Sequence, residues 1–313
     1  MIVYIIRRLG ATFIVMAVVA LFVFSLLFLT PGDPAAVIAG DIATADDIKL
    51  IRTKLGLDEP FLVQFGSWVG RLLQGDLGTS IFTSLPVTKL IGQRVEPTVS
   101  LTLLTLVIAV LIAVPVGVLA AAKAGSRIDR VVMGTSVLAF SVPVFVLAYL
   151  LISLFSIELE WLPVQGYQPI REGLWGFLSR LILPSLTLSV IYIALIARIT
   201  RTSVLEVLGE DYIRTARAKG LPRSTVLMRH ALRNAAVPIV TVIGIGVALL
   251  IGGVVVTESV YSIPGLGRLT VDAVLARDYP TVQAVILLFS GVYVLLNLLV
   301  DVAYTFLDPR IRY

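Results

Sequence analysis

The sequence contains no cysteine and a single histidine, His230, and only 14% of its residues are charged. Without cysteine there is no disulfide framework, thiolate nucleophile or cysteine metal site. One histidine also excludes a histidine metal cluster, and in its basic segment His230 is expected to be solvated or to pack. We therefore expect no metal site, bound cofactor or catalytic centre in this chain.

Apolar residues dominate the chain instead. Hydrophobic types make up 58% of the sequence and the mean hydropathy is +0.99, far from the values of soluble globular domains. A transmembrane helix needs about 20 apolar residues to cross the hydrocarbon core. Six runs reach or approach that length, at 9–30, 100–122, 131–155, 181–200, 235–257 and 281–303. The sequence therefore predicts an all-α, polytopic membrane protein with six transmembrane helices.

Basic residues near two of these runs need an explanation. Arg7 and Arg8 precede the first run, as in a signal peptide, but the run is much longer than the roughly 7 to 15 residues of a signal-peptide core. We interpret it as a retained helix. Arg198 falls in the last turn of the fourth run, where its side chain can extend to the membrane surface.

The distribution of charge predicts the orientation of the helices. Lys and Arg outnumber Asp and Glu in the termini and in the loops on the same side, whereas acids outnumber bases in the other loops. By the positive-inside rule, both termini are cytoplasmic. The pI of about 9.6 is then explained by positive charge facing the cytoplasm and anionic lipid, without nucleic acid.

This orientation places a small cap, 31–99, outside the cytoplasm and a long loop, 201–234, inside it, within a single domain over 1–313. Pro, Gly and charged residues punctuate the cap, and short helices are expected at about 45–55 and 61–73.

The cytoplasmic loop contains a basic block, 211–222, that is typical of a short helix. Glu210 and Asp211 favour a helix N-terminus, and Gly220 followed by Pro222 predicts its end. Small residues let another protein approach the backbone, and basic side chains surround them. The block indicates a surface for a soluble partner, or a plain surface helix that ends at a glycine.

The segment 211–238 resembles the cytoplasmic signature loop of permease subunits of ABC importers, in which Glu-Ala-Ala is followed by Gly at a fixed spacing. Here the triplet falls on Arg214-Thr215-Ala216, with Ala218 and Gly220 matching. Arg and Thr replace the usual first two residues, and the closing proline is the later Pro238, as in the dipeptide, oligopeptide and nickel branch. Blocks similar to that branch follow one another at 30–34, 55–60, 75–78, 141–145, 258–267 and 307–313.

The resemblance implies a heterodimeric pore of two six-helix permeases, two cytoplasmic ATPases beneath it, and an external binding protein that delivers dipeptides or short oligopeptides. Nickel, glutathione or a sugar-like ligand remain open. The chain has no phosphate-binding loop, so ATP and Mg are expected on the ATPases. The residues expected to dock on an ATPase are Tyr212, Arg214, Thr215, Ala216, Arg217, Ala218, Lys219, Gly220 and Leu221.

Five residues are candidates for the transport pathway. Pro143 is expected to kink the third helix, with Ser141 bonding a freed carbonyl and Phe145 at the edge of the pore; plain helix shaping is the alternative. Glu258 is expected to meet a peptide amino terminus or a cation near a tight turn at 264–267, or else to contact a partner subunit or Arg268. Asp301 lies within the last span, where a carboxylate belongs to the pathway or to a salt bridge.

Other functional classes receive less support. A secondary transporter is typically recognised by inverted repeats and midplane ionisable residues, which are not evident. A membrane hydrolase needs a nucleophile with a base or a metal pair, and no Lys lies within a span to complete a serine–lysine dyad. A passive channel would leave the cytoplasmic basic block without a purpose.

Overall fold

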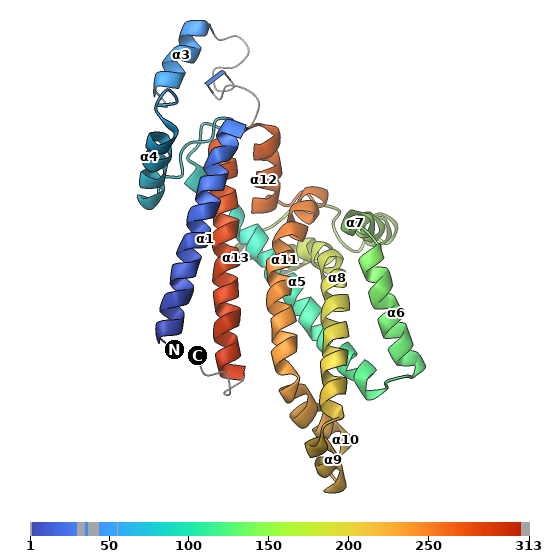
Figure 1. Ribbon diagram of the computed structural model, residues 1–313. Helices are drawn as coiled ribbons and strands as arrows, with labels where there is room; N and C mark the ends of the chain where they lie inside the picture. The colour runs from blue at the N-terminus through green and yellow to red at the C-terminus, as the bar shows by residue number, and fades with distance from the viewer. Residues whose placement is uncertain (1, 30–34, 37–43, 55, 308–313) are drawn as a thin grey trace. The chain divides into compact units, whose positions relative to one another are not determined.

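The computed structural model describes residues 2–29, 35–36, 44–54 and 56–307, which are helical apart from connecting turns and one isolated β-bridge between Thr79 and Pro86 (Figure 1). The all-α prediction is confirmed for these residues. Two compact units form, Met1–Val95 with Leu269–Val294 and Glu96–Arg268 with Leu295–Tyr313. The single domain expected over 1–313 therefore has two compact parts.

The first unit contains helices at both ends of its sequence. Its elements are α1 (Ile2–Leu29), α3 (Ala45–Lys54), α4 (Phe61–Leu73), the start of α5 (Val87–Ala122), most of α12 (Leu266–Leu275) and the first half of α13 (Tyr279–Leu307). The short helices predicted in the cap are confirmed. The last part of the expected cap is wrong as a loop, because α5 already begins at Val87.

Aromatic contacts hold α4 against α1. Phe61, Phe65 and Trp68 recur on one face of α4, and their ring centroids lie 5.4, 5.4 and 5.3 Å from that of Phe24. Such tilted and edge-on pairs add to the stability from buried apolar area. This helical spacing explains why a segment outside the predicted spans still forms a regular helix.

Asp278 fixes the start of α13 within the first unit. Its carboxylate is buried and accepts hydrogen bonds from the Ser80 hydroxyl (2.5 Å), the Ile81 N–H (3.1 Å) and the Thr281 hydroxyl (2.8 Å). An acceptor at a helix N-terminus satisfies groups that have no partner within the helix. The same carboxylate therefore begins α13 and holds the segment around Ser80.

The second unit contains the remaining helices. After α5 come α6 (Arg127–Ser141), α7 (Val144–Ile152), η1 (Ser153–Glu158), η2 (Ile170–Glu172), α8 (Leu174–Leu208), α9 (Asp211–Ala218), α10 (Arg223–Thr225), η3 (Val226–Leu232) and α11 (Ala236–Val260). α8 packs against α6, α7 and α11. Its apolar residues form much of the core, including Leu181, Leu183, Leu188, Tyr192 and Ile196.

α5 and α8 approach each other closely at Gly117. A Cβ atom placed there would lie 2.6 Å from Thr200 Cβ and 2.7 Å from the Ala197 carbonyl oxygen, both on α8. Small residues at such contacts allow two helices in a membrane protein to pack backbone against backbone. Gly117 is therefore required for this helix pair.

The third predicted span is a break rather than a kink. The expected helix over 131–155 stops at Ser141 and resumes at Val144, with a bend of 101°, and Figure 1 shows α7 turned across the end of α6. Pro143 lacks an N–H and disfavours helical backbone in Val142, which is extended. The Ser141 hydroxyl donates to the Val137 carbonyl (3.1 Å), as expected from the sequence.

Helices long and apolar enough to cross a membrane are α5, α8 and the 279–300 part of α13. The bent pairs 127–158 and 223–247 bring the number to five if each is one span. In α1 the apolar helix assessed, 10–26, is shorter than these. The six-span topology and the cytoplasmic termini stay predictions.

Gly117→Ala tests the contact between α5 and α8. The added methyl meets a backbone carbonyl and a β-branched side chain, so the helices must separate, and we expect a loss of about 1–3 kcal/mol of stability. Thermal unfolding of the purified protein measures it. Gly92→Ala on the same helix, where the methyl meets nothing within 4 Å, is the control. Equal unfolding midpoints for the two variants would contradict the contact.

Candidate functional site

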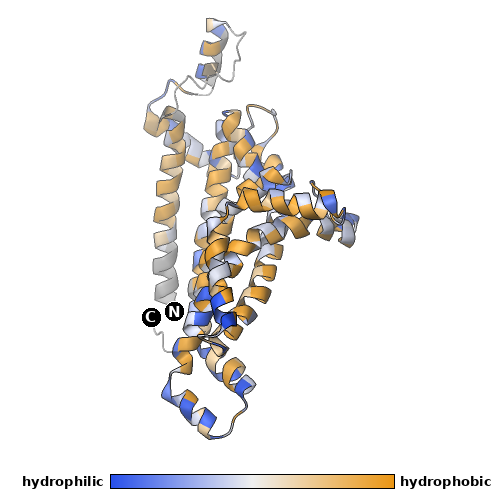
Figure 2. Cartoon of the chain, turned by 90° about the vertical axis from the view of Figure 1, so that its right-hand side faces the viewer, coloured by the Kyte–Doolittle hydropathy of each residue, from blue (hydrophilic) through white to orange (hydrophobic). Residues whose placement is uncertain are grey.

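α9 forms an exposed turn of chain at one end of the second unit. It follows α8 after two residues and packs against η3 through Ile213 and Ala216, which are 0% and 7% exposed. Figure 2 shows mixed hydrophilic and hydrophobic residues at this end, below long helices that are mainly hydrophobic. The alternation of buried and exposed residues attaches α9 firmly and leaves its outer face open.

The end of α9 has the hydrogen bonds of a glycine-terminated helix. The Gly220 N–H donates to the Arg217 carbonyl (3.0 Å) and the Leu221 N–H to the Ala216 carbonyl (3.3 Å), while Gly220 has φ +78°. This is the Schellman pattern, which favours glycine because its backbone is left-handed. The predicted helix end at Gly220 and Pro222 is confirmed. A Cβ atom on Gly220 would meet nothing within 4 Å.

The expected ATPase-contact residues divide between two faces. Thr215, Arg217, Ala218 and Lys219 are exposed, and Tyr212 and Leu221 are 44% and 37% exposed. Arg214 is exposed and pairs with Asp211 (3.1 Å), a surface contact of small energy. Burial and the charge of Glu210 raise the pKa of Tyr212. The expectation that Ala216 opens the surface to a partner is wrong, because its methyl group packs inward.

A cavity of about 580 Å³ lies beside α9. Its walls come from the ends of α5 and α8 and from the segment after α9, and they include Leu205, Leu208, Arg217 and Leu221. Arg223 also lines it and donates a hydrogen bond to the Ala122 carbonyl at the end of α5. This contact joins the loop that contains α9 to a second long helix.

Glu258 is buried at the C-terminal end of α11. Its carboxylate accepts hydrogen bonds from the Thr98 hydroxyl (2.5 Å) and the Arg268 N–H (3.0 Å), and Thr98 in turn accepts from the Leu266 N–H (2.8 Å). A Cβ atom on Gly265 would lie 2.0 Å from the carboxylate. The carboxylate is therefore enclosed by the turn that follows its helix.

That turn is shorter than predicted. A tight turn was expected at 264–267, but α12 begins at Leu266, so only the residues before it turn. Thr98 caps the start of α12 by accepting the Leu266 N–H, which makes helix possible there. Sequence analysis missed Thr98, because nothing local marks a threonine in a predicted span as a partner for a distant glutamate.

The other pathway candidates lie in different places. Ser141, Pro143 and Phe145 share the break between α6 and α7 and are exposed, Phe145 by 48%. α7 packs near the end of α11, where the Tyr261 hydroxyl contacts the Ala148 carbonyl at 3.4 Å. Asp301 belongs to α13, but its side chain lies outside the described residues, as do the blocks 30–34 and 308–313. Their roles in transport stay predictions.

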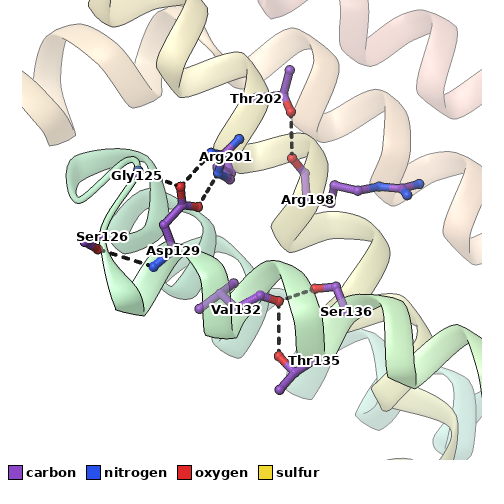
Figure 3. Close-up of polar contacts among 9 residues, drawn as sticks. All are labelled: Gly125, Ser126, Asp129, Val132, Thr135, Ser136, Arg198, Arg201 and Thr202. Carbon is purple, nitrogen blue, oxygen red and sulfur yellow. Dashed lines mark hydrogen bonds and ion pairs between the residues drawn. The ribbon is translucent and has the colours of Figure 1, made fainter.

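Sequence analysis also missed a buried ion pair between α6 and α8 (Figure 3). Asp129, in the first turn of α6, binds Arg201 Nε and Nη2 with its two carboxylate oxygens, the latter at 2.7 Å. It also accepts the Gly125 N–H (2.9 Å). Ser126, three residues before Asp129, accepts its N–H (3.4 Å), and this capping pattern was the available local signal.

Comparison with known protein families gives the decisive observation. The family model described as "Binding-protein-dependent transport system inner membrane component" matches residues 113–313, and a model of the N-terminal part of such membrane components matches residues 1–102. The chain belongs to this family. It is therefore an ABC importer permease subunit and a multi-pass inner-membrane protein, in a family whose members are transport subunits and not enzymes.

Relatives of this permease are similar over its whole length. A probable peptide ABC transporter permease protein of Sinorhizobium fredii is 57% identical over 311 residues, with 99% of each chain covered. A putative peptide transport system permease protein of Brucella abortus is 46% identical, covering 99% of this chain and 98% of its own. The glutathione transport system permease protein GsiC of Salmonella typhi is 45% identical, with 99% of each covered.

A solved structure shows the same fold. The inward-facing MetNI methionine ABC transporter matches with a TM-score of 0.59 and 20% identity, over 71% of this permease and 97% of the compared chain. At this identity the likeness concerns the arrangement of helices and not the substrate.

Substitutions at Glu258 distinguish an anchor from a pathway carboxylate. Glu258→Ala leaves two buried donors without an acceptor, so we expect a loss of about 1–3 kcal/mol and faster proteolysis near 262–268. Glu258→Gln keeps an acceptor and should retain most stability and uptake. Thermal unfolding, limited proteolysis and uptake by the assembled transporter measure both. A stable Glu258→Gln variant that has lost uptake would instead support contact with the ligand.

Proposed function

We propose that this permease forms half of the translocation pore of an ATP-driven importer for dipeptides or short oligopeptides, and that α9 connects it to a cytoplasmic ATPase. The observation that carries the proposal is the exposed, glycine-terminated helix α9 in an otherwise apolar chain. The peptide permeases that are 57% and 46% identical support the substrate class.

α9 has the properties of a mechanical contact. Its inner residues Ile213 and Ala216 attach it to η3, which leads into α11, and two residues attach it to α8. Tyr212 and Leu221 offer apolar surface among exposed charges, a composition suited to a groove on a soluble protein. A displacement of α9 by an ATPase would therefore move α8 and α11 together.

Such coupling must act in both directions. If closure of the ATPases favours one state of the pore, then a ligand-loaded binding protein that favours the same state must change ATP hydrolysis. The proposed partners are a second, similar permease, two cytoplasmic ATPases that hold ATP and Mg, and an extracytoplasmic binding protein. In the pore, the break at Ser141 to Phe145, Glu258 and Asp301 remain the pathway candidates.

Glutathione is the second candidate substrate. The GsiC glutathione permease is 45% identical over nearly the whole chain, close to the value for the Brucella peptide permease. Glutathione is itself a short peptide in its chemistry, so a pore for dipeptides and one for glutathione need similar properties. Nickel and other small solutes have no comparable observation in their favour.

Purification of the tagged permease in mild detergent tests the assembly. We expect a second permease and ATPase subunits to be recovered with it, identified by mass spectrometry. Its ATPase activity should rise when binding protein is added with a dipeptide or tripeptide, and a parallel series with glutathione distinguishes the two substrates. Recovery of a lone or homomeric protein without ATPase would contradict the proposal.

Gly220→Glu tests docking through α9. The new carboxylate would project into open space beside the expected contact, so we expect uptake to fall at least tenfold while membrane insertion is retained. Gly220→Asn is the matched control, because asparagine tolerates a left-handed backbone and adds no charge. Uptake in vesicles and ATPase co-purification are measured. Normal uptake by Gly220→Glu would refute docking at this position.

A further inference from the structure

α6 is attached to its own chain by few buried residues. Of the 15 residues of α6, only Asp129 and Ser136 are buried. Its apolar side chains point away from the second unit instead, and Val131, Val137 and Leu138 are 62%, 64% and 65% exposed. Apolar packing, which holds α8 and α11 together, therefore contributes little to the position of α6.

Two arginines of α8 contact opposite ends of α6. Arg201 binds both carboxylate oxygens of Asp129 in the first turn, where the Gly125 N–H is a third donor (Figure 3). Near the last turn, the Arg198 guanidinium lies 5.6 Å from the centre of the Phe140 ring, within the range of a cation–π contact. Charged contacts from one helix thus hold α6 at its start and near the break at Ser141.

The geometry of the Asp129–Arg201 pair makes it specific. The planar guanidinium meets the carboxylate through two nitrogens, an arrangement that sets orientation as well as distance. The Asp129 side chain is 5% exposed and that of Arg201 25%. Removing one partner leaves the other charge poorly solvated, so the pair resists separation more than a surface ion pair does.

The position of the pair connects two parts of the transport mechanism. Arg201 lies in α8 seven residues before its end at Leu208, and α9 begins at Asp211. Asp129 lies at the start of α6, whose other end is the broken segment at Ser141. A rigid α8 that moves with α9 therefore takes the start of α6 with it only while the ion pair is intact.

We propose that Asp129 and Arg201 are positioning residues for transport, which make α6 move with α8 and so transmit a displacement of α9 to the break between α6 and α7. The proposal rests on the proposed function of α9. It differs from a static structural role in its consequence: without the pair, ATP hydrolysis continues but no longer drives uptake.

The test uses the complete transporter in proteoliposomes with a radiolabelled dipeptide, dialanine, and its binding protein. Because the sequence has no cysteine, spin labels at Val137→Cys on α6 and Glu206→Cys on α8 report the distance between these helices. With the pair intact, we expect one narrow distance distribution that is the same without nucleotide and with ATP and vanadate.

Asp129→Asn and Arg201→Gln should broaden this distribution, keep at least half of the ATPase activity, and lower uptake per ATP hydrolysed at least tenfold. Arg201→Lys should give an intermediate ratio, and the reversed pair Asp129→Arg with Arg201→Asp should restore part of it. Arg130→Gln, which removes an exposed cation next to Asp129, is the control and should match the unmodified protein.

Two results would overturn the proposal. One is an unchanged distance distribution with normal uptake per ATP in Asp129→Asn. The other is a fall of ATPase activity and uptake in equal proportion, or failure of every variant of the pair to assemble, which would show a purely structural contact. Failure of the proposed function appears differently, as an unmodified protein without ATP-dependent uptake, while the broadening without nucleotide still reports on the pair.

Discussion

A hydrocarbon layer offers no hydrogen-bond partner to a polypeptide backbone, and this constraint explains most of the permease structure. Each N–H and C=O at membrane depth must find a partner inside the protein, so long helices such as α5 and α8 result. Where a helix stops at depth, the freed groups need other partners, as the Ser141 hydroxyl shows beside Pro143. Backbone of this kind is tolerated where it faces protein or a water-filled path, which suits the break to a transport pathway.

The same constraint explains the buried acids of the described residues, Asp129, Glu258 and Asp278. Each lies at a helix end and accepts a backbone N–H from a neighbouring turn as well as a side-chain donor. A buried carboxylate is costly unless its oxygens are all occupied, and turns supply donors that helices lack. These residues fix the junctions of the structure, which apolar packing alone orients poorly.

The cytoplasmic end of the second unit combines rigidity with exposure. α9 is short, and buried residues attach it to η3, while Arg223 connects its loop to the end of α5. A contact surface that transmits force must be attached to several long helices, and this one is attached to α5, α8 and α11. The slender attachment of α6 is the contrasting case, because it depends on charged contacts rather than on packed apolar side chains.

Local patterns in the sequence determined the all-helical class, the cap helices α3 and α4, and the end of α9 at Gly220. Helix caps, left-handed glycines and apolar periodicity act over a few residues, so one sequence is enough to predict them. Tertiary structure alone decided the partners of the carboxylates: Thr98 and Glu258 are 160 positions apart, and Asp129 and Arg201 are 72 apart. It also decided that Pro143 produces a 101° break, because α7 turns to bury Ala148 and Ile152 in the core of the second unit. Such pairings depend on the close approach of helices distant in sequence, which no local pattern of residues records.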